Sequence, residues 1–149
     1  MKKLLIVFSL LISSVFANAF DIDGINLNDT YISVTREISR KGYTYNHDLN
    51  CLEGVCQGVK IYLSINYVDV KKSGMLGQLI VYVPTQGNDD EKFSDFSELM
   101  NIIYHQISKE GDNLTYLVDN DGTQMILGKK DGFIVLTYNT PYYSAPKKK

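Results

Sequence analysis

The stretch VKIYLSINYV, residues 59–68, constrains the fold most, because apolar and polar residues alternate along it without interruption. The apolar set is Val59, Ile61, Leu63, Ile65 and Tyr67, and the intervening set is Lys60, Tyr62, Ser64 and Asn66. Successive side chains of a β-strand point to opposite faces of the sheet, so this pattern predicts a strand that is buried on one face only. A chain with such a strand needs a second layer to cover the apolar face.

Two helical segments can supply that layer. Apolar residues recur at helical spacing in two places, and each segment is followed by a glycine that suits a helix end, Gly42 or Gly111. The caps are expected at Asn28 or Asp29 and at Ser94 or Asp95. The apolar positions are Tyr31, Val34, Thr35 and Ile38 in the first helix, and Phe96, Leu99, Met100, Ile103 and Ile107 in the second.

Strand patterns occupy most of the remaining chain. They cover an extended segment at 43–52 and residues 59–67, 75–83, 113–118, 123–127 and 133–138. The predicted order is therefore αβββ-αβββ, which indicates an α+β fold with both helices packed on one face of an antiparallel sheet. Because Ile38–Gly42 resembles Ile107–Gly111, an internal duplication would explain this order. The alternative is a chance match, since basic residues and a glycine commonly gather at helix ends.

The N-terminus resembles a secretory signal peptide. Two lysines precede an apolar run over residues 4–16, and Ala17-Asn18-Ala19 fits a cleavage site. A bacterial protein with such a leader is expected in the periplasm or outside the cell, without a membrane span after cleavage. A retained signal anchor is the alternative. The expected division is 1–19 signal peptide, 20–140 single α+β domain and 141–149 flexible basic C-terminal tail.

Charge and motifs exclude several classes of function. Without residues 1–19, thirteen basic residues stand against seventeen acidic ones, so the net charge is near −4 and no nucleic-acid partner is indicated. The chain has no Gly-rich phosphate loop, no nucleophile elbow and no paired histidines at helical spacing. The segment Asp119–Gly122 fails the calcium-loop pattern, because carboxylates are missing at both anchoring positions. We expect no cofactor, no metal and no catalytic residues.

The only two cysteines are Cys51 and Cys56. If Glu53-Gly54 forms the tip of a two-residue hairpin, the cysteines are cross-strand neighbours with Cα atoms about 4.5 Å apart, which lies within the range of disulfides. In an exported protein such a pair is expected to be oxidised. The alternatives are a metal site that also uses His47 or His105, and a catalytic cysteine with His47.

Tyrosine is the most informative residue for binding. The chain has eleven tyrosines and no tryptophan, and several tyrosines lie on the predicted outward faces of strands. A rigid aromatic side chain offers contact area at a small entropic cost, which suits protein or carbohydrate contact. The alternative is that tyrosine simply favours strands. The candidate surface consists of Lys60, Tyr62, Asn66, Gln78 and Tyr82.

The segments GINLNDTYISVTREISRKGY and CLEGVCQGVKIYLSIN resemble a group of small exported bacterial proteins of unknown function. The similarity covers the first half of the chain after the leader. It lies in a helix that ends in Lys41-Gly42-Tyr43 and in Leu52-Glu53-Gly54 before a long strand. The order of helices and strands is also similar, at the level of the fold, to secreted inhibitor proteins built from tandem αβ units. Neither resemblance implies catalytic residues.

Two hypotheses follow. The favoured one is an exported, non-catalytic binding domain that contacts an envelope or extracellular protein or glycan through its tyrosine-bearing sheet face. The alternative is an envelope enzyme that uses Cys51 or Cys56 together with His47. The redox state of the cysteines distinguishes them, because only the enzyme needs a free thiol with a lowered pKa. Neither hypothesis predicts an oligomeric state.

Overall fold

The computed structural model describes residues 21–22, 25–56, 58–67, 74–118 and 121–143. The predicted signal peptide and residues 144–149 of the predicted tail lie outside these ranges. The elements are β1 Asp21–Ile22, β2 Ile25–Asn26, α2 Tyr31–Arg40, β3 Thr44–Asn46, β4 Cys51–Cys56, β5 Val59–Tyr67, β6 Leu76–Pro84, α3 Asp89–Ile103, β7 His105–Glu110, β8 Asn113–Leu117, β9 Gln124–Lys130 and β10 Phe133–Asn139.

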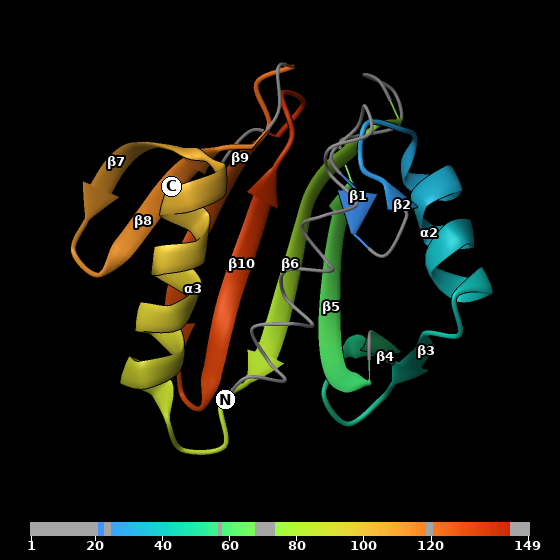
Figure 1. Ribbon diagram of the computed structural model, residues 1–149. Coiled ribbons are helices and arrows are strands. Elements are labelled where there is room, and N and C mark those ends of the chain that lie inside the picture. Colours follow the sequence, from blue (N-terminus) through green and yellow to red (C-terminus); the bar gives the residue numbers. More distant parts are fainter. Residues whose placement is uncertain (1–20, 23–24, 57, 68–73, 119–120, 144–149) are drawn as a thin grey trace, which may run out of the picture.

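The α+β class is confirmed, and most of the fold is sheet (Figure 1). An eight-stranded antiparallel sheet has the order β3-β4-β5-β6-β10-β9-β8-β7, and β1 pairs with β2 separately. Each helix is followed by four strands, so the predicted order αβββ-αβββ has too few strands. Strands β6 and β10 are the last strands of the two halves of the chain. They pair with each other in the middle of the sheet and so join the two halves.

Helix α2 forms as its apolar spacing predicts, with a different cap. Thr30 is the N-cap, and its side-chain hydroxyl accepts a hydrogen bond from the Ser33 N–H at 3.2 Å. Val34 and Ile38 are buried, which confirms the predicted apolar face. Gly42 follows the helix end with φ +92°, a conformation that favours glycine.

Helix α3 begins earlier than predicted. Its first turn contains Asp89, Asp90 and Glu91, which precede the predicted caps Ser94 and Asp95. Acidic side chains are stabilised at the positive end of the helix dipole, so this cluster favours a helix start. Phe96 and Met100 are buried, as predicted.

The prediction that α3 continues to Gly111 is wrong. The helix ends at Ile103, and Tyr104 already has an extended backbone with φ −120° and ψ 160°. Ile107 lies in β7, an edge strand in which every side chain is exposed. Gly111, with φ +59°, serves the turn between β7 and β8 rather than a helix end. The match with Ile38–Gly42 therefore compares a helix end with a strand and its turn.

One face of the sheet, here called the inner face, is buried. Leu63 of β5 is the register partner of Val81 in β6, which is the partner of Leu136 in β10. Leu136 in turn pairs with Leu127 of β9, and all four side chains are at most 2% exposed. A buried row therefore crosses four neighbouring strands, and the residues that alternate with it point to the opposite side.

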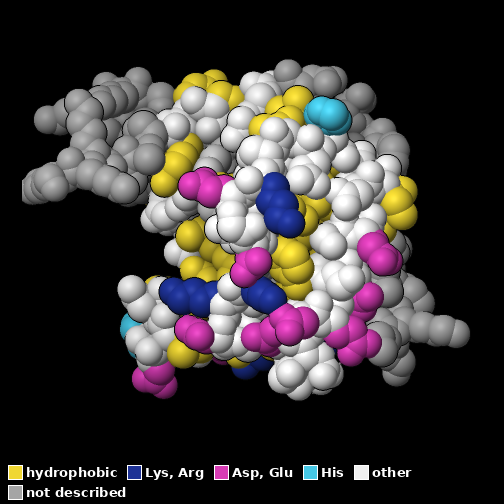
Figure 2. Space-filling model, turned by 90° about the vertical axis from the view of Figure 1, so that its left-hand side faces the viewer, with side chains coloured by type: hydrophobic (Ala, Val, Ile, Leu, Met, Phe, Trp, Pro, Cys, Tyr) yellow, Lys and Arg dark blue, Asp and Glu magenta, His cyan; other side chains and the backbone are white. Residues whose placement is uncertain are grey.

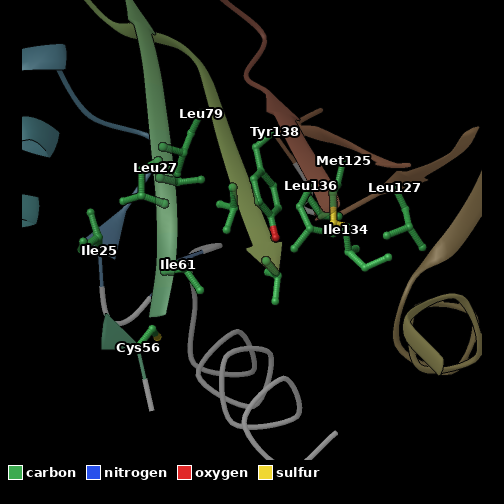
Figure 3. Packing of buried hydrophobic residues seen from close by; sticks show 14 of the residues in the cluster. Ile25, Leu27, Cys56, Ile61, Leu79, Met125, Leu127, Ile134, Leu136 and Tyr138 are labelled. Atoms are coloured by element: carbon green, nitrogen blue, oxygen red, sulfur yellow. The ribbon is translucent and has the colours of Figure 1, made fainter. Parts of the chain in front are cut away.

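The inner-face residues belong to a single hydrophobic cluster that also includes buried residues of both helices. Figure 3 shows it as a band from Cys56 and Ile61 on one side to Leu127 on the other, with Tyr138 near the middle. In the ribbon view, α3 lies over the β9–β10 half and α2 lies beside the β5 half (Figure 1). This core positions the sheet and leaves the opposite face for other contacts.

Candidate binding surface

The side of the sheet opposite the inner face, here called the outer face, carries every residue of the predicted binding surface. Tyr62 and Tyr82 are direct register partners in β5 and β6, and so are Asn66 and Gln78. Lys60 lies two residues before Tyr62 on the same face. Lys60 and Asn66 are exposed, Tyr62 and Tyr82 are half-buried, and Gln78 is only 9% exposed.

Three rings meet at one end of the outer face. The ring of Phe133 in β10 lies edge-on to Tyr62 at a centroid distance of 6.0 Å and to Tyr82 at 6.1 Å. We call Tyr62, Tyr82 and Phe133 the aromatic cluster. Edge-to-face pairs contribute about 0.5–1.5 kcal/mol beyond the area they bury, so each ring holds the others in place.

Charged residues border this cluster at one corner. The Lys60 ammonium lies 5.6 Å from the centre of the Tyr62 ring and 3.5 Å from the Glu53 carboxylate. Asn46 donates a hydrogen bond of 2.8 Å to the same carboxylate. Together the Asn46 amide and the Lys60 charge lower the pKa of Glu53. The corner therefore holds a paired charge of each sign at neutral pH.

A row of amides crosses the other end of the outer face. Asn66 donates to the Gln78 side-chain oxygen at 2.8 Å, and Gln78 donates to the Asn139 side-chain oxygen at 2.9 Å. We call these three residues the amide row. They lie four residues along the strands from the register of Tyr62 and Tyr82, which corresponds to about 13 Å.

The middle of the outer face carries no charge. The central strands β6 and β10 contain no charged residue at all, although 21% of the residues in the whole chain are charged. Their outward positions alternate with the buried ones and are Gln78, Ile80, Tyr82, Pro84, Phe133, Val135, Thr137 and Asn139. Such a surface depends on shape, aromatic contact and neutral hydrogen bonds rather than on ion pairs.

The predicted disulfide does not form, and both cysteines are free. Residues 51–56 form one continuous strand, β4, instead of a hairpin with Glu53-Gly54 at its tip. An odd number of steps along a strand reverses the face, so Cys51 points to the outer face and buried Cys56 to the inner one. Five residues of strand also separate their Cα atoms by about 16 Å, well beyond disulfide range.

The enzyme alternative finds no support at Cys51. Burial and the Glu53 carboxylate raise the pKa of the Cys51 thiol, whereas a cysteine nucleophile needs a lowered pKa. His47 is exposed and stacks edge-on to the Tyr45 ring at 4.8 Å, and His105 begins the exposed strand β7. Within the part of the chain that the structure describes, no cluster of His, Cys, Asp and Glu could hold a metal ion.

The acidic start of α3 lies in an open depression beside the β9–β10 turn. Lys129 forms an ion pair with Asp90 there and also lies 5.6 Å from the centre of the Phe93 ring. This contact lowers the pKa of Asp90. Asp89 is engaged as well, because it accepts a hydrogen bond of 3.2 Å from the Gly132 N–H. The acidic groups thus serve the helix start and its packing.

Sequence reasoning missed the contribution of β10 to the outer face. Phe133 completes the aromatic cluster, and Asn139 completes the amide row. Both come from a strand about fifty residues further along the chain than β6, and only the β6–β10 pairing brings them together. The available signal was alternation in β10, which shows that these residues share a face but not which strand lies beside them.

No family model, curated protein or solved structure matches the chain. Among the residues that the structure describes, no helix is both long enough and apolar enough to cross a membrane.

Proposed function

We propose that the protein is an exported, non-catalytic binding domain whose outer face contacts a protein partner. The uncharged, aromatic-bearing centre of that face is the observation that carries the proposal. Centres of protein interfaces are depleted of charged residues and enriched in aromatic ones, with polar groups around them. Here the aromatic cluster supplies the rings, and the Lys60–Glu53 pair and the amide row supply polar groups at either end.

A glycan is the other partner that a tyrosine-bearing face suits. The hydrogen bonds within the amide row favour a protein, because Gln78 is largely buried and already engages both neighbouring amides. A glycan site needs amides that are free to meet hydroxyl groups, whereas a flat protein surface can pack over amides that satisfy one another.

Three features accompany the proposal. Export rests on the N-terminal residues that resemble a signal peptide. Coverage of the inner face by both helices is supported by the membership of Val34, Ile38, Phe96 and Met100 in one core cluster. An internal duplication is supported by topology, since each half is a helix followed by four strands and the halves meet through their last strands. The short match between helix ends no longer contributes.

The test immobilises the protein and measures which envelope components it retains from a cell extract. The extract comes from cells that also make the untagged chain. Tyr82→Ala is expected to lose a component that the wild type retains. Tyr142→Ala is the matched control, because Tyr142 is an exposed tyrosine outside the strands of the sheet. Protease treatment of the extract should abolish retention; persistence after that treatment would identify a glycan instead. Equal retention by wild type and Tyr82→Ala would refute the outer face as the binding surface.

A further inference from the structure

We propose that a second copy of this chain covers the outer face, so that two sheets pack face to face across a two-fold axis. The inference rests on the proposed function, because it names the protein that occupies the same surface. Face-to-face sheet packing is the ordinary way in which two antiparallel sheets cover one another, at a separation of about 10 Å.

The apolar residues near the middle of the central strands favour a cover on both faces. In β6, Leu79, Val81 and Val83 are buried on the inner face, yet the outward positions include Ile80 and Tyr82. An antiparallel sheet that faces water on one side normally carries polar residues there, while near-continuous apolar strands belong to sheets covered on both sides. β10 follows the same rule, with outward Phe133 and Val135 alternating with buried residues.

The charge distribution favours a second copy. In a two-fold interface the same patch meets itself, so any net charge on it repels its own image. The whole chain carries a formal net charge of −2, but the central strands of the outer face carry none. The central strands therefore add no charge repulsion between two copies, and the outward charges Glu53, Lys60 and Lys130 lie on the flanking strands.

The size of the face suits a protein of similar dimensions. The strands β5, β6, β10 and β9 lie side by side, and four strand widths by seven residues give about 450 Å² of flat area. Including β4 and β8 raises this to about 650 Å², and side-chain relief adds to it. A standard interface buries about 600–1,000 Å² on each partner, so the face lies at the lower end of the range for a dimer.

The edges of the sheet are poor alternatives for self-association. β3 has only three residues, and β7 contains a register irregularity between Gln106 and Ser108 together with the charged residue Lys109. Short strands, bulges and edge lysines hinder pairing with another strand. On the β7 side, Figure 2 shows hydrophobic side chains surrounded by charges of both signs, unlike the uncharged centre of the outer face.

Sedimentation equilibrium of the purified protein tests the inference. Reductant is included to prevent a disulfide between two copies, because Cys51 points to the outer face. The wild type is expected to be a dimer at about 100 μM, and Ile80→Lys should weaken dimerisation at least about tenfold because it buries a charge in the interface. Raising the salt concentration should not dissociate the wild-type dimer, since no ion pair is required.

Ile102→Lys is the matched control, because Ile102 is 82% exposed on α3 and the chemical change is the same. It should leave the dimer intact. Thr137→Lys, on the neighbouring strand of the outer face, is a second variant in case Ile80→Lys does not fold, as judged by circular dichroism. A wild type that stays monomeric, or a dimer that withstands a folded outer-face variant, would overturn the inference. If that monomer still loses an envelope component through Tyr82→Ala, the proposed function stands without the second copy.

Discussion

Gly54→Ala should destabilise the protein through a single contact, with the ring of Tyr43. A Cβ atom at position 54 would clash with Cδ1 of that ring and would lie 2.6 Å from Cε1 and 2.7 Å from Cγ. Tyr43 is only 4% exposed, so its ring cannot yield without disturbing the inner face. Gly54 is therefore needed in the middle of β4 because an aromatic ring packs directly on its backbone.

The expected loss is the cost of overpacking less the general benefit of replacing glycine in a strand. Inserting a methyl group into a packed core costs about 1–3 kcal/mol. Replacing a strand glycine by alanine regains about 0.5–1 kcal/mol, because the unfolded chain loses less entropy on folding. We therefore expect the free energy of unfolding to fall by about 1 kcal/mol, and by no more than about 2.5 kcal/mol, measured by urea denaturation followed by far-ultraviolet circular dichroism.

A double-mutant cycle with Tyr43→Ala isolates the contact. In that background the ring is gone, so Gly54→Ala should be neutral or stabilising. Gly128→Ala is the matched control, because position 128 also lies within a strand but its new Cβ meets only the flexible end of Asn113, at 2.6 Å. The same loss with and without the Tyr43 ring would refute the packing explanation and favour a turn at Gly54.

Three further predictions concern the cysteines, a buried tyrosine and the amide row. Alkylation after denaturation without reductant should label both Cys51 and Cys56, and the intact mass of the protein measures the number of labels. An unlabelled protein with a mass short by two hydrogens would contradict a continuous strand β4. Burial raises the pKa of Tyr138 well above 10. As the pH rises, the unfolded chain therefore loses this proton before the folded protein does. The contribution of Tyr138 to the free energy of unfolding should be fully present below about pH 10 and fall above it by up to about 1.4 kcal/mol per pH unit. Urea midpoints at rising pH test this, and Tyr138→Phe should flatten the dependence; parallel curves would argue against it. Gln78→Leu should cost about 0.5–1.5 kcal/mol in the same urea assay, because two hydrogen bonds are lost while the less buried Asn66 and Asn139 can bond to water. An unchanged midpoint would contradict the hydrogen bonds assigned to the row.

Local patterns were sufficient where one periodicity dominated. Strand β5 follows the alternation of residues 59–67, and α2 follows the helical spacing that ends before Gly42. In both, the buried residues are those that the pattern selects. Burial of one face is enough to define such an element, because a shift of one position would expose the apolar residues.

Glycines caused the two main errors. Gly54 suggested the tip of a hairpin, but it lies within β4 because Tyr43 occupies the space of its side chain. Gly111 suggested the end of a helix, but it belongs to a turn between two strands. A glycine permits a turn, a helix end or a close approach equally well, so the sequence around it does not decide which of these occurs.

The sequence by itself determined the α+β class, the alternation of buried and outward positions along strands such as β5, and the neutral character of β6 and β10, because these depend on side chains within one segment. It also identified one set of outward residues, namely Lys60, Tyr62, Asn66, Gln78 and Tyr82. Only the tertiary structure decided which strands are neighbours, and hence that Phe133 joins the tyrosines, that Asn139 extends the amide row and that the two cysteines face opposite sides. The physical reason is that strand pairing brings together segments far apart in the chain, and backbone hydrogen bonds that form such pairs are nearly the same for every sequence.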